Sequence, residues 1–254
     1  MANLKPTIAF FGATGGSTIP CLALALKAGY RCHALVRNPS KLQDLLRQRE
    51  IPETAIQKHL SIVAGNVSDA DLVQQTLTYD GHPVDVIVSG IGGKLLFNNP
   101  LKPTLDNPTI CQDAIRAILT AARSMERKPT LIALSTTGIS DQKRDLPVAM
   151  MPMYYWMLKV PHEDKKVMEA AILAEMAKPD SERAISNYVI VRPSLLTEGD
   201  GDGLEKIKAG VEKNPAVGYV ISRNDVGLWM FEKLIRFPFW SDNPYLGEVV
   251  TITT

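Results

Sequence analysis

Short runs of apolar residues, rich in Ile and Val, alternate along this 254-residue chain with longer stretches whose apolar residues recur every three or four positions. The short runs are almost continuously apolar, which is typical of parallel strands buried on both faces. The expected strands are 7–11, 31–36, 60–64, 84–89, 131–135, 188–192 and 248–252. The expected helices are 17–28, 40–48, 69–77, 109–124, 162–177 and 225–235. Strand–helix alternation of this kind predicts an α/β fold with a doubly wound parallel sheet.

No linker, repeat or low-complexity tract divides the chain, so we expect one domain over 1–254. The pattern loosens after Pro193 through 199–203, and the last quarter is expected to form a small substrate-side cap on the same sheet. With 28 Lys+Arg against 27 Asp+Glu the net charge is +1, which gives no reason to expect nucleic acid or an anionic membrane as the main partner. A small molecule is the expected partner.

The three cysteines, Cys21, Cys32 and Cys111, are far apart and lack C-x-x-C or Cys/His ligand spacing. Neither a disulfide framework nor a metal site is expected. The first apolar run ends at Phe11, too short for the hydrophobic region of a signal peptide. The uncharged stretch 147–158 contains two prolines and is shorter than the roughly 20 apolar residues that span a bilayer. We therefore expect a cytoplasmic protein with no membrane partner.

A glycine-rich turn, Gly-Ala-Thr-Gly-Gly, follows the first expected strand. A buried strand that ends at Gly12 and a helix that begins near Ser17 would aim backbone N–H groups and a helix N-terminus at one point. That arrangement binds a pyrophosphate. The alternative is a turn without a ligand. The expected cofactor contacts in this segment are Gly12, Thr14, Gly15, Gly16, Ser17 and Thr18.

This turn, the segment 35–41, a strand that ends at Ser135 and the segment 189–193 together resemble the atypical and extended short-chain dehydrogenase/reductases. That group includes the biliverdin-IXβ (flavin) reductases and the nitrogen metabolite repressor-type proteins. The resemblance implies a Rossmann fold and a bound NAD(P). One position differs, because the family's usual third glycine is Thr18 here, and Gly16 is expected to supply the close approach of the helix instead.

The end of the second strand indicates which cofactor binds. An acidic residue there accepts hydrogen bonds from the adenosine ribose, whereas a basic residue accommodates a 2′-phosphate. This strand ends at Arg37 with no acid, and Arg37, Ser40 and Lys41 could form a charge-assisted phosphate clamp. The alternative is that Arg37 and Lys41 are solvated surface residues. We predict NADP rather than NAD.

Loops after other strands should border the cofactor, because the carboxyl ends of parallel strands lie at one edge of the sheet. The resemblance implies an Asp beside the adenine where Asn66 stands, and it implies that 193–195 covers the nicotinamide. Small residues after the fourth strand would let the backbone lie against the nicotinamide ribose. The remaining expected cofactor contacts are Asn66, Val67, Ser89, Gly90, Pro193, Ser194 and Leu195.

The resemblance also implies a catalytic hydroxyl after the fifth strand and a Tyr-x-x-x-Lys pair on the next helix, whose spacing places both side chains on one helix face. Ser135 fits the hydroxyl position. Two registers are available for the pair, Tyr155-x-x-x-Lys159 and His162-x-x-x-Lys166.

Pro161 favours the second register. Proline fits the first turn of a helix and disfavours helical geometry in the residue before it, so a helix that begins at Pro161 would exclude both Tyr155 and Lys159. We prefer Lys166 as the lysine for both catalysis and ribose binding, with His162 as the proton donor. Tyr155 is the main rival of His162, and His162 can equally be a surface residue.

Substrate-side elements are expected mainly in 138–165 and 194–222. The segment 148–157 combines four methionines with three aromatic residues, which suits a flat apolar ligand, although core packing or a dimer contact are alternatives. The leading hypothesis is an NADPH-dependent reductase that passes hydride to an apolar, aromatic or polycyclic ketone, quinone, flavin or imine. The alternatives are a non-catalytic NADP-binding sensor and a non-redox isomerase or cyclase. Both a monomer and a homodimer agree with the sequence.

Overall fold

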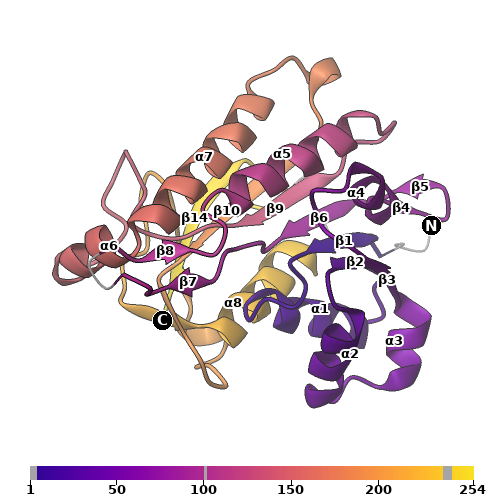
Figure 1. Ribbon diagram of the computed structural model, residues 1–254, viewed down its shortest axis with the longest axis horizontal. Coiled ribbons are helices and arrows are strands. Elements are labelled where there is room, and N and C mark those ends of the chain that lie inside the picture. The colour runs from indigo at the N-terminus through magenta and orange to yellow at the C-terminus, as the bar shows by residue number, and fades with distance from the viewer. Residues whose placement is uncertain (1–4, 100–101, 237–241) are drawn as a thin grey trace.

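An eight-stranded sheet forms the centre of the computed structural model, which describes residues 5–99, 102–236 and 242–254 (Figure 1). Its strand order is β12-β14-β10-β9-β6-β1-β2-β3. The parallel strands are β1 (Ile8–Phe11), β2 (Cys32–Val36), β3 (Leu60–Ala64), β6 (Val86–Ser89), β9 (Thr130–Leu134), β10 (Asn187–Pro193) and β14 (Glu248–Thr253). The edge strand β12 (Lys208–Val211) is antiparallel to β14. The predicted doubly wound, Rossmann-like single domain is confirmed.

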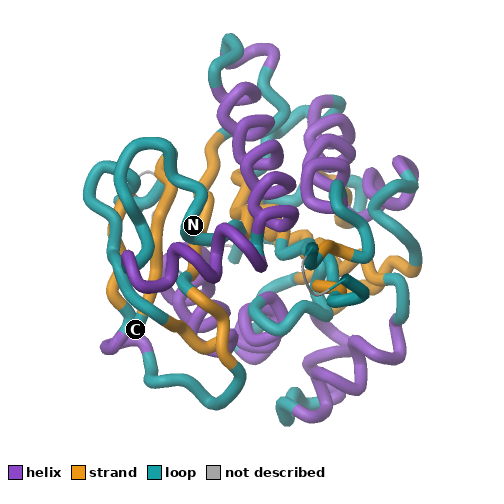
Figure 2. Tube along the Cα trace, turned by 60° about the vertical axis from the view of Figure 1, so that its left-hand side comes forward, coloured by secondary structure: helices purple, strands orange, loops and turns teal. Residues whose placement is uncertain are grey.

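Helices cover both faces of this sheet, as the two views show (Figures 1 and 2). One face carries α1 (Thr18–Lys27), α2 (Pro39–Gln48), α3 (Glu53–His59) and α8 (Arg223–Trp229). The other face carries α4 (Ala70–Thr76), α5 (Ile110–Arg123) and α7 (Lys159–Met176). The strands are buried on both sides because their side chains alternate between these two apolar clusters. This explains why the sequence shows continuous rather than alternating apolar runs.

Local signals fix the starts of several helices. Asn38 caps α2 by accepting the N–H of Lys41 at 3.1 Å, and Pro39 occupies the first turn. Asp69 caps α4 through the N–H groups of Asp71 and Leu72. The predicted last helix is divided, because a π-helical turn, Met230–Ile235, follows α8 directly.

Some elements differ from the sequence prediction. α7 begins at Lys159, two residues before Pro161, so the prediction that the helix starts at Pro161 was wrong. The proline occupies the first turn, where its missing N–H breaks no helical hydrogen bond. A separate short helix, α6 (Met151–Met157), and a helix at α3 were not expected. The edge strand β12 was not expected either. Three two-stranded ladders were also unexpected: β4 (Thr78–Tyr79) with β5 (His82–Pro83), β7 (Leu95–Leu96) with β8 (Thr104–Leu105), and β11 (Leu195–Thr197) with β13 (Val220–Ser222).

Among the residues that the structure describes, no helix combines the length and the apolar character needed to cross a membrane.

Candidate active site

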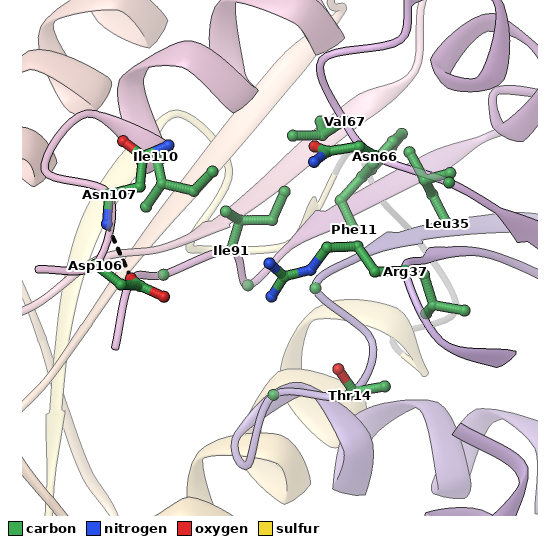
Figure 3. A pocket seen from close by; sticks show the side chains of 17 residues that line it. Phe11, Thr14, Leu35, Arg37, Asn66, Val67, Ile91, Asp106, Asn107 and Ile110 are labelled. Atoms are coloured by element: carbon green, nitrogen blue, oxygen red, sulfur yellow. Dashed lines mark hydrogen bonds between the residues drawn. The ribbon is translucent and has the colours of Figure 1, made fainter. Parts of the chain in front are cut away.

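A cleft opens at the carboxyl ends of β1, β2, β3 and β6 (Figure 3). Successive strands run outward from β1 through β2 to β3, and the next strand of the sheet, β6, then lies on the other side of β1. Open α/β sheets bind ligands at such a topological switch point. Of the cofactor contacts expected from the sequence, those that line the cleft are Gly12, Thr14, Gly15, Arg37, Asn66, Val67 and Gly90. The other lining residues are Phe11, Leu35, Val36, Gly65, Ile91, Gly92, Gly93, Asp106, Asn107 and Ile110.

The glycine-rich turn has a conformation that only particular residues allow. Gly12 has a left-handed φ of 75°, and a Cβ added there would lie 2.7 Å from the carbonyl carbon of Gly90. The N–H of Gly15 donates to the carbonyl of Gly12 at 2.8 Å, which closes the turn. The carbonyl of Gly15 then accepts the N–H groups of Thr18 and Ile19, each at 2.9 Å, and α1 begins. The strand, turn and helix are therefore joined as a dinucleotide-binding turn requires.

The turn leaves donors for an anionic ligand. Within the described chain, the N–H groups of Gly16 and Ser17 donate to no protein acceptor. The hydroxyl of Ser17 is buried and has no hydrogen-bond partner there either. Free N–H groups at the start of a helix, together with the positive end of its dipole, fit a pyrophosphate.

Thr18, at the position of the missing third glycine, is fully buried and packs against Gly90. A Cβ on Gly90 would overlap the hydroxyl of Thr18, so the space that a glycine in the helix normally provides is provided here by a glycine in the neighbouring loop. The expectation that Gly16 supplies the close approach to the strand was wrong. A Cβ on Gly16 would instead lie 2.5 Å from Cδ of Arg223.

Arg37 extends from the end of β2 into the cleft (Figure 3). In the part of the chain that the structure describes, no acidic side chain forms an ion pair with it. Ser40 and Lys41 are exposed in the first turn of α2, where the hydroxyl of Ser40 donates to Oδ1 of Asn38 at 2.7 Å, and neither residue lines the cleft. Asn66 lines it and accepts the N–H of Ser68 through Oδ1 at 3.2 Å, which leaves its amide N–H groups available.

Several other expected contacts lie outside the cleft. Ser89 is buried at the end of β6, and Ser194 is buried with its hydroxyl donating to Oγ1 of Thr253 at 2.9 Å. Pro193 ends β10 and Leu195 begins β11. Asp106 and Asn107 were not predicted from the sequence. They reach the cleft because the β7–β8 ladder, which they follow, folds back beside it.

Lys165 is the lysine that reaches the carboxyl edge of the sheet. Its Nζ donates to the carbonyl of Leu134 at 2.7 Å and to the carbonyl of Ile91 at 3.0 Å. Leu134 ends β9, and Ile91 follows β6 and lines the cleft. The half-buried ammonium therefore lies between two neighbouring strand ends, next to the cleft.

A family model of NAD(P)H-binding domains matches residues 12–235 of the chain. The chain belongs to this NAD(P)H-binding family. Reductase pytE of Aspergillus terreus is 60% identical over 265 residues, covering all of both chains. Oxidase pynE of Aspergillus niger is 36% identical over 285 residues, covering 98% of this chain and 99% of that protein.

Solved structures share the fold of this NAD(P)H-binding protein. A short-chain dehydrogenase/reductase from Veillonella parvula in complex with NADP superposes with a TM-score of 0.69 at 16% identity, over 98% of this chain and 94% of that one. ChuY, an anaerobillin reductase from Escherichia coli O157:H7, gives 0.64 at 20% identity, over 97% and 96%. The resemblance to the atypical short-chain reductases is confirmed.

The residues predicted to carry the chemistry in this NAD(P)H-binding protein are scattered. Lys166 is half exposed, and its Nζ pairs with Asp141 at 2.7 Å, away from the strand ends that Lys165 contacts. Tyr155 lies on α6 with 67% of its surface exposed, so it is outside the α7 helix, as Pro161 had indicated.

His162 is buried on α7, with its ring 5.6 Å from that of Tyr154. Burial, with the charge of Lys166 as a second cause, lowers the pKa of His162 to about 4. The imidazole is therefore neutral near pH 7, and the pKa near 6.5 on which its role as proton donor was based does not hold. It is also absent from the lining of the cleft.

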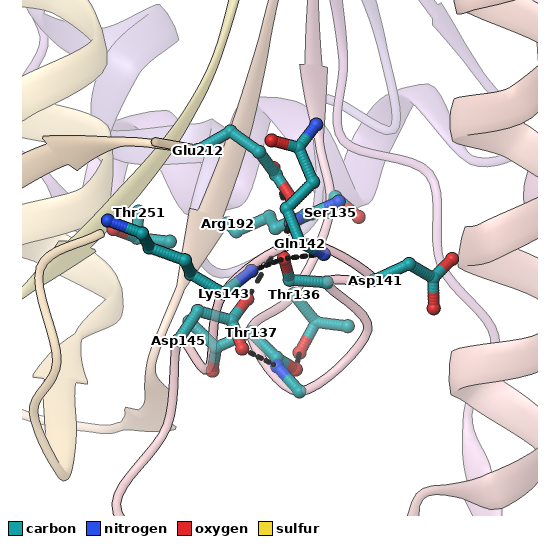
Figure 4. A network of polar contacts seen from close by, with 12 residues as sticks. Ser135, Thr136, Thr137, Asp141, Gln142, Lys143, Asp145, Arg192, Glu212 and Thr251 are labelled. Carbon is teal, nitrogen blue, oxygen red and sulfur yellow. Dashed lines mark hydrogen bonds and ion pairs between the residues drawn. The ribbon is translucent and has the colours of Figure 1, made fainter. Parts of the chain in front are cut away.

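Ser135 belongs to a buried ionic network centred on Arg192 (Figure 4). Its hydroxyl donates to Glu169 on α7, and Arg192 contacts both oxygens of that carboxylate, from Nε at 3.0 Å and from Nη2 at 2.5 Å. Nη1 of Arg192 donates to Glu212 of the segment after β12 at 2.8 Å and lies 3.7 Å from Asp145. Burial disfavours the charge of Arg192, but the three carboxylates outweigh it and raise the pKa of the guanidinium. The network joins the loop after β9, α7, β10 and the segment after β12.

The segment rich in methionine and aromatic residues divides between interior and surface. Tyr154 is buried, whereas Tyr155 and Trp156 are 67% and 50% exposed. Core packing therefore accounts for Tyr154 and not for its two neighbours. Val148 and Phe97 are also more than half exposed, on the turn before α6 and on the β7–β8 arm.

Proposed function

We propose that this chain is an NADPH-dependent reductase that transfers hydride to an apolar, aromatic or polycyclic acceptor. Membership of the NAD(P)H-binding family supports cofactor binding. The reductase that is 60% identical over the full length of both chains supports the direction of the reaction. The observation that carries the choice of NADPH is Arg37, which has no ion-pair partner within the described chain and projects into the cleft at the end of β2.

The cleft suits a 2′-phosphate better than a bare ribose. A guanidinium donates up to five hydrogen bonds in a planar fork that matches a phosphate. The acidic residue that would accept hydrogen bonds from both ribose hydroxyls of NAD is absent from the end of β2. Asp106, the acid that does line the cleft, is engaged elsewhere, because its Oδ1 accepts the N–H groups of Lys94 at 2.7 Å and Asn107 at 3.0 Å.

Lys165 is the residue that we assign to the nicotinamide half. When bound, the reduced cofactor supplies the hydride. Two of the three N–H groups of the Lys165 ammonium are used by the carbonyls of Leu134 and Ile91, which fix its position. The third faces only the weak acceptor Sδ of Met168 at 3.9 Å, which a ribose hydroxyl can replace. The residue four positions before Lys165, where the mainstream enzymes carry their tyrosine, is Pro161, which has no proton to donate.

The acceptor is inferred from the side chains around the cleft. No His, Cys or Tyr is among the described residues that line it, so no lining side chain has an ordinary pKa near neutrality. Solvent must then supply the proton, which favours quinones, flavins and imines, whose acceptor atoms water can protonate. Outside the residues that line the cleft, the exposed rings of Tyr155 and Trp156 on α6 offer stacking surface for such a flat acceptor.

Initial rates of NADPH and NADH oxidation with a panel of quinones, flavins, imines and aromatic ketones test this function. We expect turnover with at least one flat acceptor, and a kcat/KM for NADPH at least tenfold above that for NADH. Tight binding of NADPH without oxidation across the panel would show instead a non-catalytic NADP-binding protein. Equal use of both cofactors would refute the assignment of Arg37.

Variants of two adjacent lysines, Lys165 and Lys166, test which ammonium acts in the reaction. Lys165→Gln should lower kcat/KM at least tenfold, because it removes the ammonium at the strand ends. Lys166→Gln should leave it within twofold, because that ammonium pairs with the exposed Asp141. The opposite ranking would return the role to Lys166.

A further inference from the structure

Arg223, the first residue of α8, lies across the glycine-rich turn. A Cβ on Gly16 would be 2.5 Å from Cδ and 3.3 Å from Nε of Arg223, so the side chain passes directly over this glycine. Gly16 is not among the glycines with a left-handed φ, so the backbone of the turn does not require a glycine there. The glycine leaves the space that the Arg223 side chain occupies, and a side chain at position 16 would push Arg223 away from the turn.

The guanidinium of Arg223 makes only one hydrogen bond to the protein, to Glu198, within the described chain. Nε donates to Oε1 of Glu198 at 2.8 Å, and within the described chain the two Nη groups make no hydrogen bond. The Glu198 side chain is 86% exposed and that of Arg223 is 35% exposed. A pair this exposed contributes little to stability, so a better anion can readily replace the carboxylate.

The backbone of Arg223 is firmly placed even though its side chain is not. The next two residues of α8 hold the segment 198–203, since Nδ2 of Asn224 donates to the carbonyl of Gly199 at 2.6 Å and Asp225 accepts the N–H groups of residues 202 and 203. Gly227 lets α8 pack closely on α1, because a Cβ there would lie 2.8 Å from the carbonyl oxygen of Ser17. The backbone that carries the Arg223 side chain is therefore fixed relative to the free N–H groups at the start of α1.

We propose that Arg223 binds the pyrophosphate of the cofactor, together with the N–H groups of Gly16 and Ser17, and that the pyrophosphate displaces Glu198 from the guanidinium. A pyrophosphate offers oxygens for two parallel hydrogen bonds from the unpartnered Nη groups. This role rests on cofactor binding, which NADH and NADPH share. It is independent of Arg37 and of the acceptor.

Equilibrium titrations with four probes test the assignment, using the full chain and its tryptophan fluorescence or calorimetry. The probes are NADPH, NADH, ADP and adenosine 2′-monophosphate. Arg223→Gln should weaken NADPH, NADH and ADP about tenfold, as expected for the loss of a charge-assisted contact, and leave adenosine 2′-monophosphate unchanged because that probe has no pyrophosphate. Arg37→Gln should show the converse selectivity, so failure of the NADPH proposal and failure of this one are distinguishable.

Two control variants separate charge from structure. Glu198→Gln should bind ADP as tightly as the unmodified protein or more tightly, because it removes the competing carboxylate. Asn224→Ala loosens the 198–203 segment but keeps the cation, and all four affinities should stay within twofold. The proposal is overturned if Arg223→Gln keeps its ADP and NADH affinities within twofold, or if Asn224→Ala reproduces the losses of Arg223→Gln.

Discussion

Replacing Arg192 with Met would leave three carboxylates without their shared cation in the interior. The side chain of Arg192 is 6% exposed, and those of Glu169 and Asp145 are 6% and 3% exposed. Glu212 is 13% exposed. Each carboxylate would keep one hydrogen bond, from Ser135, Gly138 N–H or Ser140 respectively for Glu169, Asp145 and Glu212. The cost therefore arises chiefly from unpaired charge and not from lost hydrogen bonding.

The magnitude follows from this geometry. Removing one partner of a buried ion pair costs roughly 3–5 kcal/mol, because the remaining charge is left uncompensated. Arg192 contacts Glu169 and Glu212 directly, which places the variant in this range at pH 7. For a chain of this size each kcal/mol lowers Tm by roughly 2–4 °C, so the loss of roughly 3–5 kcal/mol should lower Tm by about 6–20 °C.

The assay is urea unfolding followed by tryptophan fluorescence and far-ultraviolet circular dichroism at pH 5 and pH 8. The deficit of Arg192→Met should be smaller at pH 5, because protonation of the carboxyl groups removes the unpaired charges. Neutralising Glu169 and Glu212 to Gln in the same chain should recover part of the loss at pH 8. The surface variant Arg47→Met is the control, since its partner Asp44 is 64% exposed, and it should cost less than about 1 kcal/mol.

Two results would refute the reasoning. A deficit below about 1 kcal/mol would mean that water or rearrangement replaces the cation at little cost. A deficit that is the same at both pH values, with no recovery in the triple variant, would mean that Arg192 stabilises through packing of its stem and not through charge.

Three further predictions concern other parts of the fold. Gly90→Ala should destabilise by roughly 1–3 kcal/mol because its Cβ overlaps Thr18, and Thr18→Gly in the same chain should restore most of this in urea unfolding. His162 binds its proton less readily folded than unfolded, so about 3 kcal/mol of stability should be present above pH 6.5 and lost as pH falls toward 4; His162→Gln should flatten that slope. Trp156→Ser should raise KM for a flat acceptor severalfold with unfolding unchanged within about 0.5 kcal/mol, and an unchanged KM would contradict its role.

Local patterns were enough to predict the sheet and the phosphate turn. All seven expected strands appear as parallel strands of the sheet, because a strand buried between two helical layers must be apolar on both faces. The turn after β1 and the unpaired Arg37 at the end of β2 are equally local, since each follows from a strand end and the residues next to it. Short ladders such as β11–β13 carried no such signal, because their pairing depends on contacts distant in sequence.

Only the tertiary structure decided which side chains lie at the carboxyl ends of the strands. Adjacent helical residues differ by about 100° in direction, so spacing alone could not rank Lys165 against Lys166, or the buried Tyr154 against the exposed Tyr155. The exchange of a glycine between positions 18 and 90 is likewise invisible in sequence, because it depends on two loops meeting at one strand edge. The sequence by itself determined the fold and the glycine-rich turn at the edge of the sheet; long-range packing determined the rotation of α7 and the side chains that face the cleft.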